Sequence, residues 1–241
     1  MAIKLHGGFP RIYSDCPWQY DNPQDFDPAR GGTPYKQMSV ADLCALAPLV
    51  QQVAAKDCIL FHWATFPKLK EAIEVMEAWG FTYTTGGFTW VKLNGTGEVI
   101  VPTQRMVMVG QDTGFTLEPN DIVLKKGVRS GQGYYTNANA ELCLIGKRGK
   151  AASLRVDNSV KQVVFEPEVV LAPMLGHSAK PEEVRDRINT LTGDIPGLEL
   201  FARPPARSPG WLKVGWEIDQ ADISVVLKQL IDGEYRRPKA A

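Results

Sequence analysis

Residues Cys58–Ala64 read C-I-L-F-H-W-A, and this stretch carries the most information about the fold. Every residue in it except His62 is apolar. A short, nearly continuous apolar run is typical of a strand that other elements cover on both faces. Such strands belong to parallel sheets that lie between layers of helices, so the stretch favours an α/β protein.

Helix signals lie on both sides of this strand in the sequence. Ser39, with Asp42 three residues later, predicts the start of a helix that runs to about Val53. Pro67 predicts the start of the next helix and Gly80 its end. Further strands are predicted at Arg11–Ser14, Phe81–Lys92, Glu141–Lys147 and Leu198–Ala202, and further helices at Lys180–Leu191 and Ile223–Asp232. This alternation predicts a single α/β domain over residues 1–241, with a central, mostly parallel sheet and helices on both faces.

The segment Asn94–Ser130 interrupts the alternation. It is rich in glycine, and it contains strand-like runs at Val99–Val109 and Asp121–Leu124 and the basic residues Lys125, Lys126 and Arg129. Long connections inside a compact domain are often functional or disordered, so we interpret this segment as an insertion that forms a hairpin or a flexible flap, and as the candidate for contacting the substrate. The last residues, 234–241, are expected to fray.

The composition is that of an ordinary globular protein. Hydrophobic residues make up 44% of the chain and charged residues 22%, and no apolar run approaches the length of a membrane span. The 27 basic residues balance 27 acidic ones, which argues against non-specific nucleic-acid binding by the whole surface but not against a local basic patch. The four cysteines show no Cys-x-x-Cys spacing and no apolar leader is visible, so we expect no metal site, no disulfide framework and a cytoplasmic location.

A second informative stretch, Ile12–Tyr20, reads I-Y-S-D-C-P-W-Q-Y. A strand-like run ends at Asp15, and ligands of parallel α/β sheets bind beyond the carboxyl ends of strands. Asp15 can accept a hydrogen bond from the exocyclic amine of a base, and the Cys16 carbonyl can accept a second one. Pro17 prevents the strand from continuing, and Trp18 offers an aromatic face for stacking. From this stretch alone, a base-binding site and an ordinary strand end with Trp18 in the core are equally good interpretations.

Several segments, taken in order, resemble the MT-A-seventy family of adenine-N6 methyltransferases, and the prokaryotic and phage branch is the most similar. The stretch around Asp15 resembles the strand and D-P-P-W motif of that family. The other matches are Y-x-x-M-S at Tyr35–Ser39, T-W-x-K at Thr89–Lys92, G-Y-x-T…E-x-C-L at Gly133–Leu144, H-S-x-K-P-x-E at His177–Glu183, E-L-F-A-R at Glu199–Arg203, and W…G-N-E at Trp211–Glu217. Each match alone is weak, but the ordered set is specific and covers roughly residues 11–218 apart from the insertion.

This resemblance implies a Rossmann-like methyltransferase fold, with S-adenosylmethionine as the methyl donor and the N6 amine of an adenine in nucleic acid as the acceptor. DNA is favoured over RNA. The catalytic residues that it implies are Asp15, Cys16, Pro17 and Trp18. The cofactor contacts that it implies are Asp15, Lys180, Phe201, Arg203, Trp216 and Glu217. We assign substrate contacts to Trp18, Tyr20, Lys92, Lys125, Lys126 and Arg129. The family branch implies the cytoplasm of a bacterial or phage-infected cell.

Three positions depart from the family pattern. Cys16 replaces the first proline of D-P-P-W, Asn137 stands near a usual arginine, and Trp216 replaces the asparagine of G-N-E. An alternative therefore stays open: a weakly active or inactive relative that binds nucleic acid as a partner subunit of a homo- or heterodimer.

Two other functions fit the sequence less well. Methylation of cytosine carbon-5 through a cysteine nucleophile uses a Pro-Cys pair, whereas here Cys16 precedes Pro17. A plain nucleotide-binding module is disfavoured because no G-x-G-x-x-G follows a predicted strand.

Overall fold

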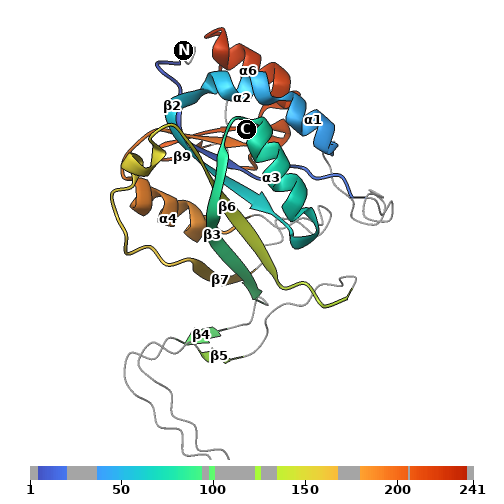
Figure 1. Ribbon diagram of the computed structural model, residues 1–241, viewed down its shortest axis with the longest axis vertical. Helices are drawn as coiled ribbons and strands as arrows, with labels where there is room; N and C mark the ends of the chain where they lie inside the picture. Colours follow the sequence, from blue (N-terminus) through green and yellow to red (C-terminus); the bar gives the residue numbers. More distant parts are fainter. Residues whose placement is uncertain are drawn as a thin grey trace, which may run out of the picture.

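A central sheet of eight strands organises the computed structural model, which describes residues 5–20, 37–93, 98–100, 123–125, 135–167, 180–205 and 207–237. The spatial order of the strands is β7-β3-β6-β2-β1-β8-β10-β9 (Figure 1). Their bounds are β1 Phe9–Ser14, β2 Ala54–Ala64, β3 Thr82–Leu93, β6 Ala140–Arg148, β7 Val163–Pro167, β8 Gly197–Leu200, β9 Arg207–Ser208 and β10 Trp211–Val214. Only β6 and β9 run against the other strands of this sheet, so the predicted mostly parallel sheet is confirmed.

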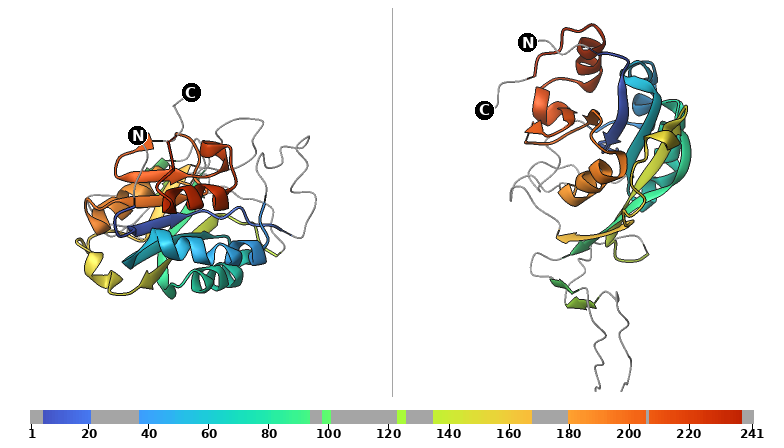
Figure 2. Two further views of the ribbon diagram at one scale, coloured as in Figure 1. Left: turned by 90° about the horizontal axis from the view of Figure 1, so that it is seen from above. Right: turned by 90° about the vertical axis from the view of Figure 1, so that its left-hand side faces the viewer.

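Helices cover both faces of the sheet (Figure 2). Their bounds are α1 Val40–Ala45, α2 Ala47–Val53, α3 Leu69–Ala78, α4 Glu182–Thr192, α5 Trp216–Asp219 and α6 Ile223–Ile231, with the 3₁₀ helices η3 Phe66–Lys68 and η4 Ala151–Leu154. Alternate strand residues face opposite layers. Ile12 and Leu60 belong to the core that includes α1, α2, α3 and α6, whereas Tyr13 and Phe61 belong to the core that includes α4. The central strands are therefore buried on both sides, as the C-I-L-F-H-W-A run predicts.

The helix predicted from Ser39 to Val53 is interrupted at its middle. Ser39 caps α1 as expected, since its side chain accepts a hydrogen bond from the Asp42 backbone N–H. Leu46 then ends α1 and begins α2. Pro48 explains the break, because it has no N–H to donate to the preceding turn and is tolerated only at a helix start.

The sequence did not predict β7 and β10. Both are short strands that pair with neighbours distant in the chain, β7 with β3 and β10 with β8. It also did not predict that β6 lies antiparallel between β2 and β3. These features depend on long-range pairing, to which a local residue pattern is insensitive.

The predicted insertion contains a small separate ribbon, β4 (Glu98–Ile100) paired antiparallel with β5 (Val123–Lys125). It lies beyond the main sheet, near the ends of β3 and β6 (Figure 1). Lys125 is the last residue of β5, whereas Lys126 and Arg129 lie outside the described residues. At the other end of the chain, Tyr235 is buried and donates a hydrogen bond to Asp219, so this residue is anchored within the stretch expected to fray. None of the helices described is long and apolar enough to cross a membrane.

Candidate active site

The topology gathers functional side chains at one edge of the sheet. Asp15 follows β1, Phe201 follows β8, and Trp216 follows β10 after a single glycine. Because these three strands are parallel neighbours, their carboxyl ends meet at the same edge. β6 runs the opposite way, so it brings a residue near its beginning, Glu141, to this edge, beside the end of β3.

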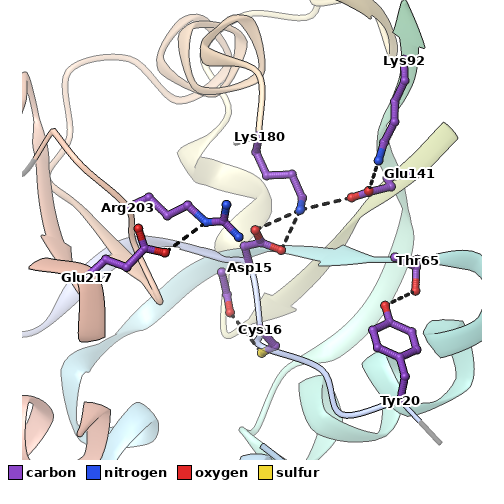
Figure 3. Close-up of polar contacts among 10 residues, drawn as sticks. Asp15, Cys16, Tyr20, Thr65, Lys92, Glu141, Lys180, Arg203 and Glu217 are labelled. Atoms are coloured by element: carbon purple, nitrogen blue, oxygen red, sulfur yellow. Dashed lines mark hydrogen bonds and ion pairs between the residues drawn. The ribbon is translucent and has the colours of Figure 1, made fainter. Parts of the chain in front are cut away.

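A chain of four alternating charges runs across this edge (Figure 3). The Lys180 Nζ lies 2.9 Å from each carboxylate oxygen of Asp15 and 3.1 Å from Oε2 of Glu141. The other oxygen of Glu141, Oε1, lies 2.6 Å from Lys92 Nζ. Only 12% of the Lys180 side chain is exposed, so the two carboxylates, rather than water, stabilise the charge of this ammonium group.

The pKa values follow from this pairing. Burial alone lowers the pKa of Lys180, but Asp15 and Glu141 outweigh burial and raise it above its ordinary value. Burial alone raises the pKa of Glu141, but Lys180 and Lys92 outweigh it and lower the pKa to about 2. Both groups are therefore charged at neutral pH, and Lys180 holds the Asp15 carboxylate in a defined position.

The turn after Asp15 is fixed by its own hydrogen bonds. The Trp18 N–H donates to the Cys16 carbonyl at 2.9 Å, and the Met38 N–H donates to the Pro17 carbonyl, also at 2.9 Å. The Gln19 N–H donates to the Met38 carbonyl at 3.1 Å. A carbonyl oxygen has two lone pairs, so the Cys16 carbonyl can still accept a hydrogen bond from a ligand.

A cavity of about 520 Å³ opens beside Asp15. The residues of the site that line it are Asp15, Pro17, Phe201, Arg203, Trp216 and Glu217. The Arg203 Nε lies 3.6 Å from Glu217 Oε1, so the two side chains form a polar pair at the wall. Cavities of this size suit ligands of the size of a nucleoside derivative.

Backbone geometry sets the two aromatic side chains at this cavity. Phe201 has a φ of +58°, a left-handed conformation that is uncommon for a bulky residue and often marks a functional site. Gly215 approaches the neighbouring chain so closely that an added Cβ would lie 2.7 Å from the Ala202 nitrogen. Only glycine permits this approach of residue 215 to Phe201 and Ala202, and both Phe201 and Trp216 line the cavity.

The family model of MT-A70 matches residues 9–113 and 121–217, which include Asp15, Glu141, Lys180 and Arg203. The chain belongs to the MT-A70 family. Its fold is accordingly the Rossmann-like methyltransferase fold that the sequence motifs implied.

Several curated relatives agree with this assignment. The chain is 26% identical to the type II methyltransferase M.MunI of Mycoplasma over 92% of this chain and 82% of that protein. It is 24% identical to the Drosophila N(6)-adenosine-methyltransferase MT-A70-like protein and 23% identical to the human N(6)-adenosine-methyltransferase catalytic subunit METTL3. These matches cover 98% and 99% of this chain but only 31% and 34% of the two relatives, so the chain spans about a third of their length.

The structure corrects the expectation for Trp18 in the motif of the MT-A70 family. Its side chain is only 6% exposed and packs edge-on against His62, so it offers no open face to a base. The Trp18 side chain lies in the hydrophobic core, in one cluster with Leu43 and Trp79. Pro17, rather than Trp18, faces the cavity.

Of the predicted substrate contacts that the structure describes, Tyr20 and Lys92 lie near Glu141 (Figure 3), whereas Lys125 does not belong to the main sheet. Tyr20 is partly buried and hydrogen-bonds with the Thr65 hydroxyl at 2.8 Å. Lys92 is held by Glu141 and lies with its Nζ 4.9 Å from the ring centroid of Trp90. Lys125 belongs to the separate β4–β5 ribbon, and Asn137, one of the departures from the family pattern, is exposed.

Glu141 is the residue at this site that the sequence analysis missed. It stands first in the E-x-C-L block, but no role was assigned to it. The feature that could have indicated a role is a charged residue near the start of a mainly apolar strand, at the same sheet edge as Asp15. That signal becomes informative only when β6 is known to run antiparallel to its neighbours.

A buried histidine behind the turn predicts how stability depends on pH. His62 is fully buried between Trp18 and Trp79, and burial lowers its pKa from 6.5 to about 3. Below pH 6.5 this histidine becomes protonated in the unfolded chain but stays neutral in the folded protein. The free energy of unfolding therefore falls as the pH falls. Between pH 6.5 and 4.5 this single group should remove about 2 kcal/mol from the free energy of unfolding.

We therefore expect His62→Phe to lose this part of the pH dependence, measured by urea unfolding at pH 6.5 and 4.5. His6→Gln is the matched control, because His6 is exposed. An unchanged pH dependence in His62→Phe would show that His62 is protonated in the folded protein.

Proposed function

We propose that this protein transfers a methyl group from S-adenosylmethionine to the N6 amine of an adenine in nucleic acid. The observation that carries this proposal is the position of Asp15: it follows the first strand of the MT-A70 motif, lines the cavity and is held by Lys180. The same edge presents two hydrogen-bond acceptors, the Asp15 carboxylate and the Cys16 backbone carbonyl, for the two N–H groups of an exocyclic amine.

The residues around the cavity fit S-adenosylmethionine chemically. The Asp15 carboxylate suits the neighbourhood of a sulfonium cation, and Phe201 and Trp216, the latter 47% exposed, supply aromatic surface. Arg203 supplies a hydrogen-bond donor and Glu217 a hydrogen-bond acceptor at the wall, and the two hydroxyls of a ribose can pair with both kinds of group. Lys180, whose Nζ contacts Asp15, is a cation beside the proposed reacting centre that could attract the donor's carboxylate.

S-adenosylmethionine, when bound, supplies an electrophilic methyl group. The amine of adenine is a poor nucleophile, because its lone pair is delocalised into the ring. Asp15 and the Cys16 carbonyl accept hydrogen bonds from its two N–H groups and so favour the pyramidal geometry in which the lone pair is available. The Asp15 carboxylate also stabilises the positive charge that develops on this nitrogen in the transition state.

The buried thiol of Cys16 weighs against the cysteine mechanism for cytosine. Cys16 is 4% exposed, and burial raises the pKa of its thiol far above the ordinary value. The thiolate is the nucleophile in such reactions, and a neutral buried thiol is inert. The Cys16 backbone carbonyl, rather than its sulfur, is therefore the atom we assign to the reaction.

We favour DNA over RNA as the substrate. The support is the match to the type II methyltransferase from Mycoplasma, which covers most of both chains, whereas the two adenosine methyltransferases are covered only to about a third.

We also propose that the insertion at residues 94–130 is a flap that contacts the nucleic acid and that the chain forms one domain. A base in a duplex must leave the stack to reach the cavity, which costs a few kcal/mol, so single strands are the easier substrate.

The direct test incubates the purified protein with labelled donor and with DNA or RNA, and identifies the methylated nucleoside by mass spectrometry. We expect N6-methyladenine in DNA. Methylation of cytosine, or of RNA alone, would contradict the corresponding part of the proposal. Failure of the protein to bind donor by calorimetry would favour the alternative, an inactive partner subunit.

A further inference from the structure

Four aromatic side chains in the described part of the chain are exposed to solvent, namely Phe66, Tyr83, Tyr135 and Trp216. A single exposed aromatic residue is common on protein surfaces, so its position decides whether it has a role. Trp216 lines the cavity beside Asp15, and Phe66 does not. Phe66, which is 54% exposed, also belongs to none of the family motifs found in the sequence, so neither the cavity nor the motifs assign it a role.

Phe66 lies at the same edge of the sheet as Asp15. β2 is the parallel neighbour of β1 and ends at Ala64, and Phe66 follows two residues later in η3. Ser14 pairs with His62 in this register. Asp15 is one residue beyond that pair and Phe66 is four, so the two are separated by roughly 10 Å along the strand direction. A nucleotide adjacent to an adenine at Asp15 can therefore reach Phe66.

The order of the strands gives Asp15 two different sides. β1 lies between β2 and β8 in the sheet. Arg203, which we assign to the donor, follows β8, whereas Thr65 and Phe66 follow β2. Figure 3 shows Arg203 and Thr65 on opposite sides of Asp15. The donor methyl group and the acceptor amine must meet at Asp15, so a donor on the β8 side leaves the β2 side for the nucleic acid.

Hydrogen bonds hold the backbone around Phe66 in place. The Thr65 hydroxyl forms a hydrogen bond with the Tyr20 hydroxyl at 2.8 Å. The Lys68 N–H donates to the Thr65 carbonyl at 3.0 Å, and the Leu69 N–H donates to the Phe66 carbonyl. A fixed turn therefore presents the ring, which lowers the entropy lost when a base stacks on it.

We propose that Phe66 stacks on the base next to the target adenine in the nucleic acid. This inference rests on the proposed function. Stacking requires an open aromatic face, and Trp18, the residue that the sequence predicts for this contact, is buried. Phe66 has an exposed ring and no polar group in its side chain, so it accepts any base. A base that stacks on a protein side chain has left its neighbours in a duplex, so the contact favours a single-stranded substrate.

The test measures how strongly Phe66→Ala binds single-stranded DNA. The probe is a labelled pool of oligonucleotides with one central adenine and random C, G or T at the other positions. Fluorescence anisotropy at saturating S-adenosylhomocysteine gives the dissociation constant, which we expect to rise about tenfold, as for the loss of one stacked base. Phe66→Trp should keep the wild-type affinity and Phe66→Leu should not, because stacking requires an aromatic ring.

Tyr83→Ala is the matched control. Tyr83 is 39% exposed and lies near the start of β3, at the opposite edge of the sheet, so its loss should leave the dissociation constant unchanged. A thermal melt checks that each variant is folded. The affinity of Phe66→Ala for S-adenosylhomocysteine should equal that of the wild type, because Phe66 lies outside the lining of the cavity.

A second pool, with abasic sites on both sides of the adenine, locates the contact. The wild type should bind this pool about tenfold more weakly than the first, and Phe66→Ala should weaken binding no further. Equal effects of Phe66→Ala on both pools, or no effect on the first, would overturn the inference, and methylation of adenine by the wild type would then leave the proposed function standing. A wild type that binds neither nucleic acid nor S-adenosylhomocysteine would overturn the proposed function and this inference with it.

Discussion

Asp15→Asn should lower kcat by about 10²–10³-fold. Asparagine keeps the size of the side chain but removes the negative charge beside the reacting amine. The charge matters most in the transition state, where the nitrogen becomes positive, so the loss should fall on kcat rather than on binding. The measurement is methylation of an adenine-containing oligonucleotide at saturating donor, with S-adenosylhomocysteine affinity measured in parallel by calorimetry.

The control for Asp15→Asn is Glu77→Gln, the same loss of charge at an exposed position on α3. It should leave kcat unchanged. Because Lys180 keeps its contact with Glu141, the Asp15 variant should remain folded, which a thermal melt checks. Wild-type turnover in Asp15→Asn would refute the role of this carboxylate in the reaction.

Glu199→Ala should lower the free energy of unfolding by about 3–5 kcal/mol. Glu199 lies in β8, is buried, and accepts from Arg185 Nε at 3.1 Å, with Lys213 Nζ at 4.0 Å. Both cations are buried as well, so removal of the carboxylate leaves Arg185 dependent on the exposed Glu182 and takes away the carboxylate beside Lys213. Burial raises the pKa of Glu199 despite these partners, which shows how costly charge is at this position.

The matched control is Glu182→Ala, which removes another carboxylate bound to the same arginine. The Glu182 side chain is 67% exposed, so its loss should cost about 1 kcal/mol or less. Urea unfolding of the two variants gives the comparison. Equal effects would mean that the buried cluster contributes no more than a surface ion pair does.

Much of the fold could be predicted because its signals are local. The apolar run Cys58–Ala64 lies within β2, and the strand predicted at Arg11–Ser14 lies within β1. The two predicted helices of the second half, Lys180–Leu191 and Ile223–Asp232, differ from α4 and α6 by at most two residues at either end. Helix caps and hydrophobic spacing act over a few residues, so the sequence displays them directly.

The candidate site was only partly predictable. Asp15 stands out because a carboxylate ends an apolar strand and a proline follows it. The burial of Trp18 could not be predicted, because it depends on where α1 and α3 place Leu43 and Trp79 around the indole. The partners of Lys180 could not be predicted either, because Asp15 and Glu141 are 165 and 39 positions away in the sequence.

The residue order alone determined the type of each central element, the carboxylate at the end of β1 and, through its ordered motifs, the MT-A70 family. The tertiary structure alone decided that β6 is antiparallel, that Glu141 meets Lys180, and that α6 forms a wall of the cavity. The physical reason is the range of the interactions. Caps, turns and apolar periodicity are properties of neighbouring residues, whereas strand pairing, buried ion pairs and cavities arise only where distant segments pack together.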